Sequence, residues 1–507
     1  MPMLENRKFR FLIFFCALCL LIAAVGGFLL FERQLCMGIP VVSQDSLGAY
    51  DHDDSISLAH LRFNGEPIAA DISTNTIYIS QSPEELIHYS TLQGTLTSEH
   101  PKQHLVFVRS AALEDIPAAV GSGTPLSLTI KEGDRCRTVN VVVTTLPVLN
   151  INGKETHTNE EGRSVFSGTA TLWAGFDPAL DSYSTVSSDL QWHIRGNSTA
   201  SERKTSWKLS YKAKNGENKN VELLGQGKDD DWILNSLTMD DTRIKEKLFM
   251  DLWNAIATQT DYNYKMSSGE YVEVVINGEY LGLFLLQRRL DAKYLDLDEE
   301  DVLLKVTSYQ AASAQEAYEF VTPPVNKSQI YAIMQDVFER KDASGFHLGN
   351  VIDVNLMLQL ASARDNFSLK NMYIVLNKTD HGYHQFLVPW DTDQSFGVVW
   401  KTDIGFCYDY QQSLGEFTTR METAALKKLH PEYQQSAIER WHFLRQSTLS
   451  ESSMLYCIDS IYEQLIQSGA LARDTAKWSN RYGGEDTVGS LKDFIHDRLL
   501  FLDDRYQ

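Results

Sequence analysis

A predicted hairpin decides how the last third of the chain folds, and it has the sequence ARDNFSLKNMYIVLN at residues 363–377 and QFLVPWDTDQSFG at residues 385–397. Residues 372–376 and 385–389 are apolar runs typical of strands, and the residues between them are rich in turn formers. An antiparallel return would place Asp391 close to Asn371, and therefore close to Asp365 just before the outgoing strand. The pattern predicts that acidic and amide side chains converge at one end of this hairpin.

The residues at this end of the hairpin suit a metal ion and an acid–base group. Closely placed carboxylates repel each other unless a cation neutralises them. Asp391 and Asp393, with the oxygen of Asn371, form a hard-ligand set suited to Mg²⁺ or Mn²⁺. Asp365, left off the metal, can accept a proton from a substrate hydroxyl, which is the arrangement of phosphoryl-transfer sites. The alternative is a solvated hairpin with acidic ends.

A second stretch supplies positive charge: IRGNST at residues 194–199, followed by Lys204 and by the strand SWKLSY at residues 206–211. A turn of small polar residues between strands can direct N–H groups and hydroxyls at phosphate oxygens. Because successive side chains of a strand point to opposite faces, Lys208 lies on the face opposite to Trp207. Lys208 is therefore the better phosphate partner, and Lys204 is the alternative. A polar hairpin with exposed lysines is the other interpretation. The candidate cofactor-binding residues are Arg195, Asn197, Ser198, Lys204 and Lys208.

A helix is predicted over residues 241–258, with Asp241 as its N-cap and Leu248, Phe249 and Leu252 facing inward. Glu246 on this helix is a candidate partner for the strand lysine, as kinase folds require of one helix glutamate. The alternative is a solvated helix face. Neither a G-x-G-x-x-G loop nor a G-x-x-x-x-G-K-[ST] loop is present in the sequence.

The N-terminus has the pattern of a membrane anchor. Residues 11–31 contain no charged side chain, and Arg7, Lys8 and Arg10 precede them. A helix of that length spans roughly 31 Å, close to the hydrocarbon thickness of a bilayer. The basic residues predict a cytoplasmic tail at residues 1–10, a single-pass anchor in the cell membrane and extracytoplasmic main domains. A cleaved signal peptide is the alternative, although its apolar region is normally shorter.

The rest of the chain divides by pattern into a linker at residues 32–56, a β-rich accessory module at 57–147 and a mixed domain at 148–507. Short alternating runs fill the module, whereas the mixed domain contains an Asn277-Gly278 hairpin signal and helical periodicity toward its end. We therefore predict an α+β fold with a helical C-terminal part, preceded by a small all-β module and one transmembrane helix.

Composition excludes some functions. The 507 residues exceed one ordinary core, and the net charge of −21 speaks against a nucleic-acid binder. Beyond the apolar N-terminal run, the cysteines are too widely spaced for a C-x-x-C zinc pair, and their disulfide pairing stays open. These are Cys36, Cys136, Cys407 and Cys457.

Together these motifs resemble the CotH family of atypical kinases, named for a spore-coat protein kinase. The resemblance covers roughly residues 145–505, and its motifs are RGNST with Lys204 and Lys208, Asp231-Trp232 with Asp241 and Arg243, Tyr271 with NGEYLG at 277–282, Asp365 with Asn371, WDTDQSFG at 390–397, and a tail from Glu439 to Asp503. It implies a protein-kinase-like domain that binds ATP with Mg²⁺ or Mn²⁺ and phosphorylates Ser/Thr of surface or spore-coat proteins. It also implies that Asp365 is the catalytic-loop aspartate and Asp391 the metal aspartate.

The sequence departs from the family pattern in two places. Gln287 stands where members often carry a glutamate, which weakens any lysine or metal partnership there. The spacing from Asp365 to Asn371 is one residue longer than in ordinary kinases, so Asn366 is a rival metal ligand. Two other functions remain open: a catalytically silent kinase-like scaffold for surface or coat assembly, and a glycosyltransferase that holds Mn²⁺ through Asp391 and Asp393.

Overall fold

The computed structural model divides into two compact units, and each is described by itself. The first unit comprises Met1–Asn150, Thr171–Thr185 and Val275–Tyr280, and the second comprises the remainder. The structure describes residues 35–83, 92–177, 182–196, 198–307, 311–340, 342–367, 371–397, 411, 428–482 and 484–507.

The first unit is built on an eight-stranded sheet in the order β1-β2-β9-β10-β11-β7-β6, with β3 paired to β11. Alternating residues explain its core: Leu126, Leu128 and Ile130 of β10 are all buried. A second sheet has the order β5-β4-β8. The strands are β1 Leu35–Cys36, β2 Ile39–Val42, β3 Asp51–His52, β4 Leu61–Phe63, β5 Glu66–Pro67, β6 Ala69–Asp71, β7 Thr76–Ser80, β8 Leu96–Ser98, β9 Gln103–Val108, β10 Leu126–Glu132 and β11 Arg135–Thr144.

Two predictions for this unit need correction. The segment predicted as a linker contains β1, β2, the 3₁₀ helix η1 (Gln44–Leu47) and β3, and Ile39 and Val41 within it are buried in the core. The module is also not all β, because α3 (Ala111–Glu114) and α4 (Ile116–Ser122) follow β9. The strands of this segment could not be predicted from its polar composition, because its few apolar residues are buried only by packing against strands that are distant in the sequence.

Seven strands close into a barrel in the order β12-β13-β14-β15-β18-β20-β19. Closure leaves no strand edge unpaired. Neighbouring strands of the barrel contribute large buried side chains, such as Trp192, Leu209 and Trp232. The strands are β12 Val148–Thr158, β13 Ser164–Asp177, β14 Ser182–Arg195, β15 Ser206–Lys212, β18 Asp231–Asn235, β19 Gly269–Ile276 and β20 Glu279–Arg288, and a separate ribbon pairs β16 Val221–Glu222 with β17 Lys228–Asp229.

The hairpin signal at Asn277-Gly278 is confirmed, since these two residues connect β19 to β20. Both have positive φ angles, +52° and +77°. A two-residue turn with this geometry matches the twist of the strands it joins.

Helix α5 (Lys245–Ala257) lies within the predicted helical range, but it begins four residues after Asp241. Asp241 is instead buried and bonded to distant backbone groups. The Asp240 side chain accepts hydrogen bonds from the N–H groups of Thr242 and Lys245, so it stabilises the entry to the helix. The predicted inward-facing residues are all buried, and they are Leu248, Phe249 and Leu252.

A four-stranded sheet in the order β22-β21-β23-β24 carries the predicted hairpin. Strands β23 (Met372–Thr379) and β24 (Gly382–Pro389) pair antiparallel, with Met372 opposite Pro389. Helix α8 (Leu348–Ala361) is almost wholly buried, and its Asn350 amide bonds to both backbone groups of Leu387 on β24. The other elements here are β21 Val302–Val306, β22 Tyr318–Phe320, α6 Ala314–Ala317, α7 Lys327–Gln335, the π-helix η3 Asp336–Arg340 and α9 Arg364–Phe367.

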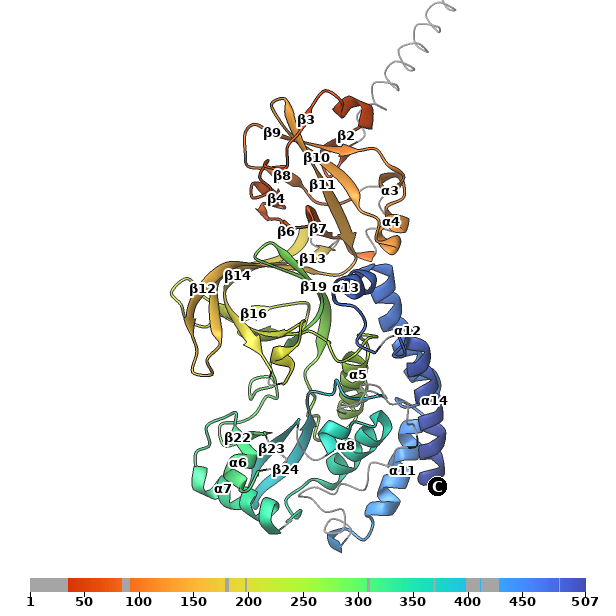
Figure 1. The fold of residues 1–507 in the computed structure, drawn as a ribbon. Helices are drawn as coiled ribbons and strands as arrows, with labels where there is room; N and C mark the ends of the chain where they lie inside the picture. The colour runs from red at the N-terminus through yellow and green to blue at the C-terminus, as the bar shows by residue number, and fades with distance from the viewer. Residues whose placement is uncertain are drawn as a thin grey trace, which may run out of the picture. The chain divides into compact units, whose positions relative to one another are not determined.

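The chain ends in helices, as the periodicity predicts (Figure 1). Arg440 forms a bidentate pair with Asp353 of α8, at 2.7 and 2.9 Å. Arg498 is fully buried and donates to the carbonyl of Gln359 near the end of α8. The helices are α11 Tyr433–Arg445, α12 Glu451–Gln467, α13 Ala470–Trp478 and α14 Val488–Arg505.

The predicted anchor at residues 11–31 and the tail before it lie outside the described residues. Within the described part of the chain, no helix combines the length and apolar character needed to cross a bilayer. Cys36, Cys136 and Cys457 are free thiols. Cys407 lies outside the described residues.

Candidate active site

The hairpin brings Asp365 and Asn371 into direct contact. Asn371 Nδ2 donates to Asp365 Oδ2 at 2.7 Å. The N–H of Trp390 donates to the carbonyl of Asn371 at 3.0 Å, so the residue before Asp391 is fixed beside Asn371. The predicted meeting of these segments is therefore observed, and it follows from the antiparallel register of β23 and β24.

Asn366 links the two segments from inside. Its side chain is fully buried, and Nδ2 donates to the carbonyls of Asn371 (3.0 Å) and Trp390 (2.7 Å). Its Oδ1 is buried and has no hydrogen-bond partner among the described residues. The amide nitrogen thus acts as a structural clamp, while the orphan oxygen keeps Asn366 available as the rival ligand that the sequence suggests.

The backbone around the site adopts strained conformations. Asn371 and Asp391 both have φ +56°, and Phe396 has φ +50°. Each such non-glycine residue costs about 1 kcal/mol, so surrounding contacts must hold it in place. One of these contacts is the hydrogen bond from the N–H of Phe396 to the carbonyl of Ala361 at the end of α8, at 2.6 Å.

Four carboxyl groups lie close enough to perturb one another. Burial raises the pKa of Asp393 well above its usual value, and Asp391, Glu246 and Asp365 raise it further. Burial, followed by the charge of Asp391, raises the pKa of Glu246 to about 8. Such crowding is relieved by protons or by a cation.

Helix α5 contributes Glu246 to this cluster. The side chain is 1% exposed, and Thr392 Oγ1 donates to its Oε2 at 3.1 Å. Glu246 is therefore not on a solvated face, and among the described residues it forms no ion pair with Lys204 or Lys208, which pair with Asp474 and Asp231. Both interpretations of the sequence were wrong. It contacts the Asp391–Asp393 segment because α5 packs its first turn against the loop after β24.

The chemistry of the cluster is compatible with a magnesium ion that takes few protein ligands. Among the residues with described positions, no group of three or more His, Cys, Asp or Glu side chains is placed to hold a metal by itself. Mg²⁺ commonly takes only one or two carboxylates and completes its shell with water and phosphate oxygens. The raised pKa of Asp393 and the orphan oxygen of Asn366 are the features that such an ion would satisfy.

Arg195 lies at the end of β14, and its guanidinium stands 5.6 Å from the centroid of the Trp390 ring. Arg163 donates to the carbonyls of Ile194 and Gly196, which fixes the start of the following turn. Ser198 begins a short 3₁₀ helix, and Asn197 lies outside the described residues.

The two candidate lysines have different surroundings. Lys208 on β15 is partly exposed and pairs with Asp231 at 2.9 Å, a carboxylate that also pairs with Arg289. Lys204 is buried, pairs with Asp474 of α13 at 2.7 Å and donates to the carbonyl of Leu283. We therefore no longer expect Lys204 to contact phosphate. Sequence spacing could not reveal this, because its partner is 270 residues away.

Burial and ion pairing also shift the pKa values of Lys204 and Asp474. Burial lowers the pKa of Lys204 to about 8. Burial alone would raise the pKa of Asp474, but Lys204 and Arg243 together hold it below its usual value. Asp474 stays ionised between two cations, which is the pairing that buried charges require.

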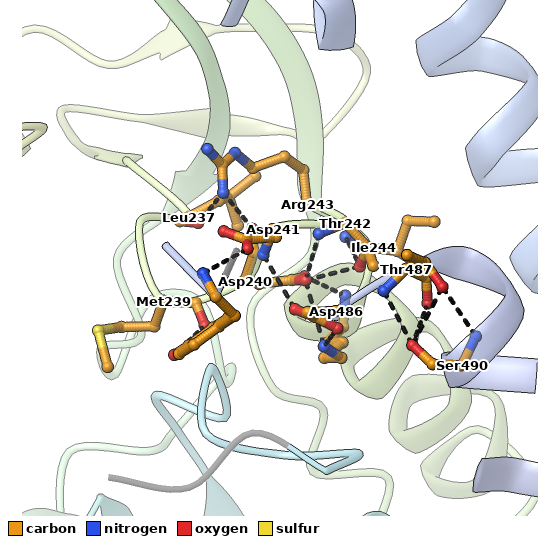
Figure 2. Close-up of polar contacts among 12 residues, drawn as sticks. Leu237, Met239, Asp240, Asp241, Thr242, Arg243, Ile244, Asp486, Thr487 and Ser490 are labelled. Atoms are coloured by element: carbon orange, nitrogen blue, oxygen red, sulfur yellow. Dashed lines mark hydrogen bonds and ion pairs between the residues drawn. The ribbon is translucent and has the colours of Figure 1, made fainter. Parts of the chain in front are cut away.

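Buried polar contacts also fix the start of α5 (Figure 2). The N–H of Asp241 donates to Asp486 Oδ2 at 3.0 Å, and the Asp241 carboxylate accepts the N–H groups of Arg481 and Tyr482. Lys245 forms an ion pair with Asp486. Because Glu246 follows Lys245 directly, these contacts set its position in the acidic cluster.

Sequence reasoning missed Lys305 on β21. Lys305 lies opposite Tyr373 in the sheet. The signal available was a lysine inside the apolar run VLLKV at residues 302–306, where charged residues are rare. The departure at Gln287 is likewise buried on β20, and its Oε1 has no partner among the described residues.

Aspartates and an asparagine at one end of a hairpin, with a helix glutamate and an arginine nearby, are residue types that phosphoryl-transfer sites use. The model of the family described as CotH kinase protein matches residues 192–502. The chain belongs to this family, and membership suggests a kinase-like function. No curated protein matches the chain.

Proposed function

We propose that the chain is a protein kinase that transfers the γ-phosphoryl group of ATP to serine or threonine hydroxyls. The observation that carries this proposal is the 2.7 Å hydrogen bond between Asn371 and Asp365 beside the strained Asp391. A base, an amide and a carboxylate are thereby held at one point, as in-line transfer to a hydroxyl requires.

Each residue of the site has a role in this proposal. Asp365 accepts the proton of the attacking hydroxyl, and the hydrogen bond from Asn371 Nδ2 to Oδ2 holds its carboxylate in place. Asp391, Asn371 and Asp393 would hold Mg²⁺ or Mn²⁺, with Asn366 as the alternative amide ligand. The bound ion supplies positive charge that offsets the developing charge on the phosphate oxygens. Arg195, which stands over the ring of Trp390, binds the phosphates.

The test is transfer of labelled phosphate from ATP, to the chain itself or to an added protein, with Mg²⁺ or Mn²⁺. We expect Asp365→Ala and Asp391→Ala to reduce transfer by 100-fold or more, on the order of removing a catalytic group. Asp380→Ala is the matched control, because Asp380 is exposed at the opposite end of the same hairpin. Nucleotide binding without transfer in the wild type would favour the silent scaffold, and hydrolysis of a sugar nucleotide would favour the glycosyltransferase.

We further propose that the kinase is anchored in the cell membrane by residues 11–31 and acts on surface or spore-coat proteins outside the cytoplasm. The support is the uncharged run with basic residues before it. Protease added to intact cells should then degrade the main domains, and a chain lacking residues 1–31 should leave the membrane fraction. Full protection in intact cells would contradict the proposed orientation.

A further inference from the structure

Lys305 stands out among the basic residues of the second unit. It belongs to β21, where Leu303 and Leu304 are fully buried and Lys305 is partly buried. Glu319 lies opposite it on β22, but within the described part of the chain the Lys305 side chain forms no hydrogen bond or ion pair. Lys204, Lys208 and Arg289 all have carboxylate partners.

An aromatic pair connects Lys305 to Arg195. Tyr373 lies opposite Lys305 in the β21–β23 register. The Tyr373 and Trp390 rings meet edge to face, with centroids 5.6 Å apart. Arg195 stands over the Trp390 ring, and it too forms no ion pair among the residues that the structure describes. Within the described part of the chain, two cations whose side chains form no ion pair thus flank one aromatic pair, and Trp390 of this pair directly precedes Asp391.

Burial and two neighbouring arginines disfavour the charged form of Lys305. Burial, followed by the charge of Arg195, lowers the pKa of Lys305, and Arg289 acts in the same direction. Glu319 and Asp391 oppose this, but they do not reverse it. Partly desolvated like charges are unfavourable unless an anion joins them. The arrangement therefore favours an anionic ligand.

We propose that Lys305 and Arg195 together bind the phosphate oxygens of a polyphosphate, on the side of the acidic cluster where Asp391 lies. The ligand class is a polyphosphate, and the identification with ATP rests on the proposed function. Arg195 offers a planar fork suited to two oxygens, and Lys305 acts as a point charge. The pair replaces Lys204, whose ammonium is occupied by Asp474.

The direct test is calorimetric binding of inorganic pyrophosphate to the full chain in detergent. Lys305→Met should weaken binding about tenfold or more, as for loss of one charge-assisted hydrogen bond, and Lys305→Arg should restore most of it. Lys378→Met is the matched control, because Lys378 lies toward the far end of β23 and contacts Tyr383. Affinity of Lys305→Met within twofold of the wild type would overturn the proposal.

A second measurement uses the unaltered protein and so does not depend on folding of a variant. An amine-reactive ester should label Lys305, and pyrophosphate should protect it, whereas Lys378 should be labelled equally with and without pyrophosphate. Labelling of Lys305 that ignores pyrophosphate would refute the assignment.

The phosphate-transfer assay separates this inference from the proposed function. Binding that depends on Lys305 in a protein that transfers no phosphate would uphold the binding residues and refute the kinase. Transfer and binding that are both unaffected by Lys305→Met would uphold the kinase and refute the binding residues.

Discussion

At the scale of single residues, partners rather than residue type decide what a charged side chain does. Lys204 and Lys305 are both lysines on or beside strands, but Lys204 is enclosed by Asp474 and a carbonyl. The Lys305 side chain forms no ion pair or hydrogen bond among the described residues, although Glu319 lies opposite it on β22. The first is therefore a structural group, and the second is placed to meet an anion.

Lys204→Met should lower the free energy of unfolding by about 3 kcal/mol, because it leaves a buried carboxylate with one cation fewer. Its pyrophosphate affinity should stay at the wild-type value. Urea unfolding and calorimetry measure the two effects. Lys208→Met is the matched control, since its partly exposed pair with Asp231 should contribute under about 1 kcal/mol. Lost affinity with unchanged stability would show that Lys204 binds phosphate after all.

The raised pKa of Glu246 makes stability depend on pH. Because the folded-state pKa of about 8 exceeds the usual value near 4.5, the folded state keeps a proton that the unfolded chain releases. Stability therefore falls as pH rises from about 4.5 to about 8 and levels off above that. Glu246→Gln should remove this loss, so that in metal-free buffer it is more stable than the wild type at pH 8 by roughly 2 kcal/mol or more and similar to it at pH 4.

Denaturant unfolding in the presence of a chelator, repeated from pH 4 to pH 9, measures this difference. The exposed Glu299 provides the control variant, Glu299→Gln, which should follow the wild-type curve. An advantage for Glu246→Gln that did not grow with pH would show that Glu246 is already ionised in the folded protein.

At the scale of elements, the C-terminal end of α8 positions the Asp365 segment. Its last carbonyls are used by the N–H of Ala363, the N–H of Phe396 and the Arg498 guanidinium from α14. A cation at this end of a helix is also favoured by the helix dipole. Asp365 is only two residues beyond Ala363, so a displacement of the end of α8 would also displace Asp365.

Arg498→Met should therefore reduce the turnover of phosphate transfer about tenfold while changing KM for ATP little, and Arg498→Lys should recover part of it. Faster hydrogen exchange of the Ser362 and Ala363 amides should accompany the loss. Arg440→Met is the matched control, since it removes an arginine contact to the middle of the same helix. Equal effects of the two substitutions would indicate general destabilisation rather than positioning.

At the scale of the whole molecule, a chain with a net charge of −21 assembles a local site for an anion. Arg195 at the end of β14 and Asp391 after β24 both lie close enough to Lys305 on β21 to affect its pKa. Buried pairs such as Lys245–Asp486 fix the helix that carries Glu246. Local geometry thus overrides net charge in setting what the site can bind.

The sequence by itself determined the hairpin of β23 and β24, the Asn277-Gly278 turn and the proximity of Asp365, Asn371 and Asp391. These features depend on strand alternation, turn residues and register, which act over a few tens of residues at most. Such signals can be recognised without knowing what packs against them.

Only the tertiary structure decided the partners of Lys204, the burial of Glu246 beside Thr392 and the position of Lys305 across the sheet. It also incorporated the segment predicted as a linker into a sheet and closed seven strands into a barrel. Each of these depends on contacts between segments far apart in the chain. The free energy of such contacts comes from burial and charge pairing, which no local pattern of residues encodes.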